Sequence, residues 1–138
     1  MNPETKALTM WLKTLIEMKE VKLWKAFSEF IRRRDSDENG YGKCFTCHRT
    51  INWKDGDCGH GIGRQHKATK YDEQNNHLQC KKCNGFEGGE QAIYKEEVDK
   101  RYGKGTWDKL VLKSRQVCKR GKFEIDTMAK YYQNANKL

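Results

Sequence analysis

The sequence predicts an α+β fold that is mainly helical, with a metal-bound central segment flanked by N-terminal and C-terminal helices. Two observations predict it. Helical periodicity dominates both ends of the chain, and closely spaced cysteine pairs occur only in the middle. Hydrophobic residues make up only 36% of the 138 residues, so the core is modest and a structural metal would add useful stability.

The N-terminal segment is predicted to be helical over residues 4–34, and Pro3 suits a helix start. Its apolar side chains recur at helical spacing: Leu8, Trp11, Leu12 and Leu15, then Leu23, Trp24, Phe27, Phe30 and Ile31. The stretch from Glu17 to Lys22 leaves open a bend into two helices. We assign residues 1–36 to a helical segment that serves packing or dimerisation.

The centre of the chain differs from both ends. The composition of residues 36–42 predicts a turn, and residues 43–85 have almost no helical periodicity. Short hairpins and loops are therefore expected there. We assign residues 37–103 to a metal-stabilised core.

Three helices are expected after the central loops, over residues 89–101, 106–119 and 123–135. The first should stop at Gly103, and Thr106 should cap the second. Cys118 would then lie in a helix as a core thiol. Residues 104–138 are assigned to the same domain as the core.

The charge balance points to a polyanionic partner. Lysine and arginine total 28 against 19 acidic residues, a formal charge of +9, which favours nucleic acid over an acidic protein or a membrane surface. No apolar run approaches the roughly 20 residues that span a bilayer, and charges interrupt the N-terminal apolar stretches as they would not in a signal peptide. We expect a cytoplasmic protein without membrane contact, whose cysteines are metal ligands or free thiols.

Two CxxC pairs predict a structural zinc site. Cys44 and Cys47 form one pair, and Cys80 and Cys83 form the other. Each pair can offer two thiolates to one tetrahedral ion, so we expect one Zn²⁺ per chain. The gap between the pairs holds 32 residues, longer than the usual roughly 15–20, so an extra segment is inserted between them.

The inserted segment contains GDCGHGIGRQH, residues 56–66, which could be half of a zinc site or a catalytic loop. Four cysteines already close a zinc site, which argues against Cys58 and His60 as zinc ligands. A metal-dependent phosphodiesterase needs a base near neutral pH and oxygen ligands for a hard divalent ion. His60 and the later asparagines Asn75, Asn76 and Asn84 supply these groups in a suitable order.

The order CxxC, histidine after glycine, asparagine, then CxxCN resembles the HNH or His-Me finger (ββα-metal) nucleases built on a zinc treble clef. It resembles more specifically the phage NinG (Rap) recombination nucleases. The segments that carry the resemblance are FIRRRD, CFTC, GDCGHGI, NNHLQCKKCN, GGEQAIY and the later YG. They span roughly residues 30–103, about half of the chain.

The resemblance implies a role for each matching residue. His60 would be the general base, and Asn84 would bind a catalytic Mg²⁺ or Mn²⁺. Asn75 would hold the hairpin by hydrogen bonds, with Asn76 as the alternative. The family implies a DNA endonuclease that cuts branched DNA such as Holliday junctions in the bacterial host, acts as a homodimer, and works beside phage recombination proteins.

One departure from the HNH pattern concerns the residue before the base. These nucleases commonly place an aspartate there as a metal ligand, and this chain has Gly59. Asp57 lies two residues earlier and would share a strand face with position 59, so it could bind the same ion. The alternative is a turn-capping Asp57 after Gly56.

Several basic residues are candidate DNA contacts, since each neutralised phosphate adds salt-dependent affinity. They are Arg32, Arg33, Arg34, Arg64, His66, Lys67, Lys70, Lys81 and Lys82. The arginine run is equally explained as a solvated helix end that suits the helix dipole. His66 could contact phosphate or metal, or could be a solvated loop histidine.

Three rival functions remain open at this stage, one of them an RNA-directed role. A zinc-stabilised nucleic-acid-binding module would use the same charge and zinc without catalysis. A general nicking HNH endonuclease would cut without a preference for branches. For the remaining candidates, Cys58 is expected to face the hairpin core, and His77 either hydrogen-bonds towards the site or simply packs.

Overall fold

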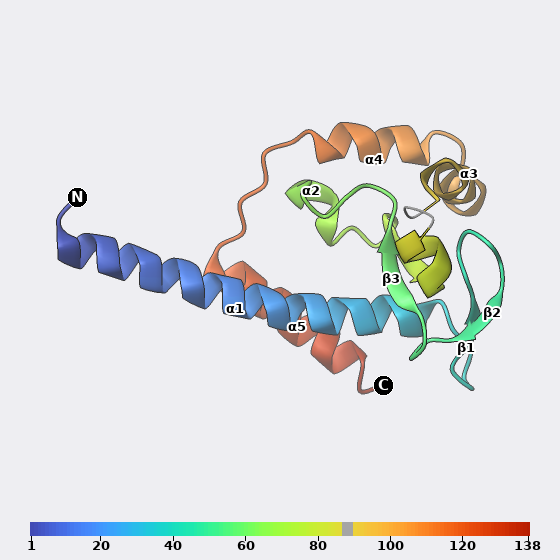
Figure 1. Cartoon of the computed structure of the whole chain (residues 1–138), viewed down its shortest axis with the longest axis horizontal. Helices are drawn as coiled ribbons and strands as arrows, with labels where there is room; N and C mark the ends of the chain where they lie inside the picture. The colour runs from blue at the N-terminus through green and yellow to red at the C-terminus, as the bar shows by residue number, and fades with distance from the viewer. Residues whose placement is uncertain (87–89) are drawn as a thin grey trace. The chain divides into compact units, whose positions relative to one another are not determined.

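The computed structural model describes residues 1–86 and 90–138 and is α+β, mostly helical, with two small antiparallel sheets (Figure 1). The helices are α1 (Pro3–Arg34), α2 (Lys67–Lys70), α3 (Gln91–Tyr102), α4 (Thr106–Ser114) and α5 (Lys122–Ala135), with a π-helical turn η1 (Lys82–Phe86). The strands are β1 (Tyr41–Lys43), β2 (Thr50–Asn52), β3 (Asp57–His60) and β4 (Asn76–Gln79). The predicted α+β class is confirmed.

The chain divides into two compact units. One comprises Met1–Phe30 with Arg120–Leu138, and the other comprises Ile31–Lys119. The domain boundaries expected after residues 36 and 103 stay a prediction. Within the first unit the C-terminal helix α5 packs against residues 19–30 of α1, and within the second unit α4 packs against α2 and α3.

Helix α1 is continuous over 32 residues, so the bend considered between Glu17 and Lys22 is not formed. The side chain of Asn2 accepts a hydrogen bond from the backbone N–H of Thr5 at 2.8 Å, which satisfies one free donor of the first turn. Three arginines occupy the last turn, where positive charge suits the helix dipole.

The first unit is built on contacts between α1 and α5. The rings of Phe27 and Tyr132 lie 5.0 Å apart in an edge-to-face arrangement, and Lys19 pairs with Asp126 at 2.8 Å. Trp11, expected to serve packing or dimerisation, is 60% exposed in the single chain. Helical spacing identified the apolar face of α1 but not how much of it α5 would cover.

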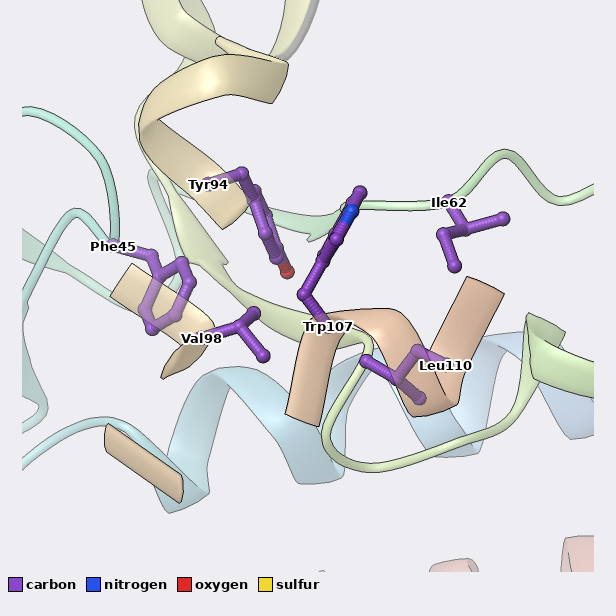
Figure 2. Close-up of a cluster of buried hydrophobic side chains, with 6 residues drawn as sticks. All are labelled: Phe45, Ile62, Tyr94, Val98, Trp107 and Leu110. Atoms are coloured by element: carbon purple, nitrogen blue, oxygen red, sulfur yellow. The ribbon is translucent and has the colours of Figure 1, made fainter. Parts of the chain in front are cut away.

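The core of the second unit is a cluster of six buried residues from the loops and from α3 and α4 (Figure 2). They are Phe45, Ile62, Tyr94, Val98, Trp107 and Leu110. The loop residues precede or follow the strands that carry the predicted site. Burial of this cluster therefore fixes α3 and α4 against those strands.

The helices after the central loops match the prediction in part. Helix α3 ends before Gly103, whose φ of 111° favours glycine, and its expected start at Gly89 lies outside the described residues. Helix α4 ends at Ser114 rather than at residue 119, so Cys118 is a half-buried residue of the following segment and not a helical core thiol. The segment beyond Ser114 has no apolar face to bury, and Val117 is 89% exposed.

Thr106 does not cap α4. Gly105 occupies the N-cap position, and Thr106 is the first helical residue, with its hydroxyl donating to the carbonyl oxygen of Gly103 at 2.7 Å. Helix α5 begins at Lys122 and ends at Ala135, close to the predicted range of 123–135.

Two leucines of α4 give a matched test of the second core. Leu110 is 3% exposed, whereas Leu112 is 63% exposed. Leu110→Ala should lower the free energy of unfolding by about 2 to 5 kcal/mol, because it leaves a cavity in the six-residue cluster. Leu112→Ala should change it by less than about 0.5 kcal/mol. Urea unfolding followed by tryptophan fluorescence measures both, and equal effects would contradict this core assignment.

Candidate functional site

The four predicted zinc ligands come together in space. Cys44 and Cys47 follow β1, Cys80 follows β4, and Cys83 lies in η1. Their sulfur atoms all lie within 4.8 Å of one another. The Sγ atoms of Cys47 and Cys80 are 3.8 Å apart, which matches the edge of about 3.8 Å in a tetrahedron with Zn–S bonds of about 2.3 Å. This cysteine cluster could hold a structural metal ion such as zinc, as predicted.

Local electrostatics prepare one thiol of the cluster for ionisation. Burial acts to raise the pKa of Cys44, but hydrogen bonds from backbone N–H groups, including those of Cys47 and Cys80, bring this pKa down to about 6. Burial raises the pKa of Cys83 to about 12. Four thiolates at this spacing repel one another, so a central divalent cation is what would allow all four to ionise.

The stretch GDCGHGIGRQH contributes strand β3 to a two-stranded hairpin with β4, which we call the β3–β4 hairpin. The strands are antiparallel, with Asp57 opposite Gln79 and His60 opposite Asn76. Cys58 is buried here and its thiol donates to Asn76 Oδ1 at 3.8 Å. Burial raises the pKa of Cys58 to about 12, so it stays a neutral thiol. Among the described residues, Cys58 and His60 are not part of the cysteine cluster.

Asn75 fastens the loop that follows β3. Its side chain is fully buried and accepts a hydrogen bond from the N–H of Ile62 at 2.8 Å. The same amide donates to the carbonyl oxygens of Ile62 at 3.0 Å and Thr69 at 3.1 Å. One side chain thus satisfies three backbone groups that would otherwise be buried without partners.

Asn76 adds a second clamp farther along the chain. Its amide donates to the carbonyl oxygens of Lys70 at 3.1 Å and Asp72 at 2.8 Å. The sequence left open which of the two asparagines holds the hairpin. In the structure Asn75 holds the near part of the loop, and Asn76 holds the far part.

His60 lies at the end of β3 and is half-buried. Its Nδ1 atom is buried, and no described residue offers it a hydrogen bond. Burial lowers the pKa of His60, and the positive charge of Arg64 lowers it further. The imidazole is therefore neutral near pH 7, the form that can accept a proton.

Asp57 and Asn84 are brought together although 27 residues separate them. The Asn84 amide donates to Asp57 Oδ2 at 3.1 Å, and the Lys81 ammonium lies 2.8 Å from Asp57 Oδ1. Asp57 belongs to β3, and its carboxylate faces η1 instead of capping a turn. Because η1 contains Cys83, the position of Asn84 is tied to the cysteine cluster.

The structure gives a steric reason for glycine at position 59. A Cβ atom there would lie 1.9 Å from Oε1 of Gln79, whose side chain is fully buried. The amide of Gln79 also donates to Thr46 Oγ1 at 3.0 Å, which fixes its direction. Gln79 thus fills the space where an aspartate side chain at position 59 would begin. This steric role could not be predicted from the sequence, because Gln79 belongs to no recognisable motif.

The loop cations expected to contact DNA lie close together in the chain after β3. Arg64, His66 and Lys67 are exposed, while Lys70 lies 5.2 Å from the ring centre of Tyr71. His66 occupies the position before α2, and its side chain makes no capping hydrogen bond. Near the second cysteine pair, Lys82 is also exposed.

The arginine run at the end of α1 divides into two roles. Arg34 donates to Asp35, to the Glu73 carbonyl at 2.8 Å and to the Asn76 carbonyl at 2.8 Å, so it braces the β3–β4 hairpin from within. Arg32 and Arg33 instead lie 5.2 Å and 4.8 Å from the ring centre of Trp53. Sequence analysis missed Trp53, although an aromatic residue beside Lys54 was a usable signal for cation–π contacts.

His77 makes the hydrogen bonds and the packing that the sequence left as alternatives. Its ring stacks on Phe45 with centroids 3.7 Å apart and planes 7° apart. Its two nitrogens lie 2.8 Å from the hydroxyl of Tyr94 and 2.7 Å from the hydroxyl of Tyr102. Neither tyrosine was singled out from the sequence.

Comparison with known proteins gives one match. A family model described as "Bacteriophage Lambda NinG protein" matches residues 4–138. No curated protein and no solved structure matches the chain. Within the described residues, no helix has both the length and the apolar character needed to cross a membrane.

The cysteine cluster predicts how single cysteine variants behave. Cys80→Ser should lower bound zinc from about one ion per chain towards zero and unfold the second unit, because metal binding and folding are coupled. Cys118→Ser is the matched control outside the cluster and should keep zinc and fold. Elemental analysis and circular dichroism measure both effects. About two zinc ions per wild-type chain would contradict the four-cysteine assignment.

Proposed function

Because the chain belongs to the bacteriophage lambda NinG family, we propose that it is a metal-dependent, structure-selective DNA endonuclease. Its substrates would be branched recombination intermediates such as Holliday junctions. Family membership suggests a role related to phage recombination, and the reaction itself is our inference from the β3–β4 hairpin and η1.

The proposal rests on two observations, a half-buried His60 at the end of β3 and an Asp57–Asn84 pair at the start of the same strand. A neutral, half-buried imidazole at the end of β3 can take a proton from a water molecule that attacks the scissile phosphate. Its buried Nδ1 leaves Nε2 as the nitrogen suited to this proton transfer. A binding module without catalysis would have no use for such a base together with the Asp57–Asn84 pair.

Asp57 and Asn84 are the residues suited to a catalytic Mg²⁺ or Mn²⁺. Their side-chain oxygens are the hard ligands that such ions prefer. Asn84 donates to Asp57 through its amide nitrogen, so the amide oxygen of Asn84 remains available for a cation. When bound, the ion would stabilise negative charge on the phosphate and the leaving oxygen. Lys81 now lies beside Asp57 and would have to move aside; two-thirds of its side chain is exposed.

The basic surface supports DNA as the substrate. The net charge is +9, and exposed cations flank the hairpin at Arg64, Lys67 and Lys82. Symmetrical cutting of a four-way junction needs two active sites, so a homodimer fits the proposed reaction. By the family resemblance, the products would carry 5′-phosphate and 3′-hydroxyl ends.

If His60 is the general base, its removal should lower the cleavage rate without lowering the affinity for DNA. His60→Ala should lower the cleavage rate of a labelled four-way junction by at least about 10² to 10⁴ in Mg²⁺, because the water loses its general base. Junction affinity and zinc content should stay at wild-type values. Gel cleavage, gel shift and elemental analysis measure the three quantities.

The same assay separates the rival functions. A wild-type protein that binds the junction but never cuts it in Mg²⁺ or Mn²⁺ would be a nucleic-acid-binding module. Equal cutting of the junction and of a linear duplex with the same sequence would instead indicate a general nicking endonuclease. Preferential cutting of the junction that depends on the metal supports the proposal.

The lowered pKa of His60 predicts a pH dependence. A general base acts in its neutral form, so a pKa below about 6.5 extends cleavage to more acidic pH. Arg64→Gln removes one cause of this lowering, so the acidic limb of the rate profile should move to higher pH. Lys104→Gln removes an exposed charge of the same unit and should leave the limb in place. Single-turnover rates from pH 4.5 to 8 test this, and equal shifts in the two variants would contradict it.

A further inference from the structure

Tyr94 of α3 reaches both strands of the β3–β4 hairpin through one buried hydroxyl group. This hydroxyl lies 3.0 Å from the carbonyl oxygen of Gly59 and 3.0 Å from that of Asn75. Gly59 directly precedes His60, and Asn75 directly precedes β4. The Tyr94 ring is fully buried within the six-residue core (Figure 2), so the direction of its hydroxyl is fixed by packing.

His77 determines how the Tyr94 hydroxyl is used. The single proton of this hydroxyl is directed at the two carbonyl oxygens, so its oxygen accepts from Nδ1–H of His77 at 2.8 Å. Nε2 of His77 is then the acceptor for the hydroxyl of Tyr102 at 2.7 Å. Burial lowers the pKa of His77 to about 2, so the ring stays neutral and keeps this one tautomer.

The carbonyl groups of both glycines that flank His60 are hydrogen-bonded to side chains of α3. On one side Tyr94 contacts the Gly59 carbonyl, and on the other the Gln91 amide donates to the Gly61 carbonyl at 2.9 Å. The N–H of Gly61 also donates to the Asn75 carbonyl at 3.0 Å. The backbone is therefore anchored on both sides of His60. No described residue offers a hydrogen bond to Nδ1 of its ring.

We infer that Tyr94, oriented by His77, is the positioning residue that holds the His60 imidazole in place for proton transfer. The inference rests on the proposed endonuclease function. Because no described residue hydrogen-bonds Nδ1 of His60, the anchored backbone on either side contributes to the orientation of the ring. A displacement of about 1 Å in a catalytic group can cost about 10²-fold in rate, so this backbone support would matter for the reaction.

The test compares two tyrosines of the same unit. Tyr94→Phe removes one oxygen and keeps the packed ring, so zinc content and junction affinity should stay at wild-type values. Its single-turnover cleavage rate should fall about 10- to 100-fold. Tyr71→Phe removes the hydroxyl of another buried tyrosine and should cut at the wild-type rate.

A second readout does not depend on cleavage. Amide hydrogen exchange at Gly61 should speed up in Tyr94→Phe, and the NMR signals of the His60 ring should shift, whereas Tyr71→Phe should change neither.

Variants at position 77 test the role of His77. His77→Asn keeps an N–H donor near the place of Nδ1 and should retain more cutting than His77→Leu. A role limited to packing would not favour the polar variant.

The outcomes separate this inference from the proposed function. If the wild type cuts junctions and Tyr94→Phe cuts equally fast, or loses affinity instead of rate, the positioning role is wrong. If the wild type cuts no substrate, the proposed function fails, and the NMR comparison alone decides whether Tyr94 positions His60. Unchanged Gly61 exchange and His60 signals in Tyr94→Phe would then overturn the inference.

Discussion

The convergence of four cysteine sulfurs within 4.8 Å is the constraint on which the second unit depends. It joins the end of β1 to the end of β4 and the start of η1, and so closes the 32-residue insertion into a loop with fixed ends. Ordering so long a loop costs conformational entropy, which a modest hydrophobic core offsets less readily without the cysteine cluster. Because Cys83 of η1 belongs to the cysteine cluster, the cluster also determines the position of the next residue, Asn84, near Asp57.

Between the two cysteine pairs, hydrogen bonds of buried polar side chains hold the loop and the β3–β4 hairpin in place. Asn75 and Asn76 satisfy backbone groups of the loop, and His77 with Tyr94 ties the hairpin to α3. These four side chains each make hydrogen bonds to buried groups, which makes the arrangement specific, since an unpaired group would cost about 1–3 kcal/mol. Nδ1 of His60, at the proposed reaction centre, is a buried atom to which no described residue offers a hydrogen bond. An unsatisfied group at that position fits a site arranged for chemistry.

Much of the candidate site could be predicted because its ligands obey short spacing rules. The CxxC pairs specify the cysteine cluster locally, since two residues between thiols suit one metal ion. Gln79 could not be predicted, because it acts on Gly59 across the hairpin and register is set by the whole sheet. Arg34 likewise looked like a surface cation, and only its contacts with the Glu73 and Asn76 carbonyls show an internal brace.

The sequence by itself determined the helices with strong periodicity, the four cysteines that could bind a metal, and the family. Spacing along the chain is sufficient for these features, because helix faces and CxxC pairs depend on near neighbours. Only the tertiary structure decided that α5 packs against residues 19–30 of α1, that α4 stops at Ser114, and that Tyr94 of α3 bonds the Gly59 carbonyl beside His60. These features depend on contacts between residues far apart in the chain, whose pairing is set by the packing of the complete core and not by local propensity.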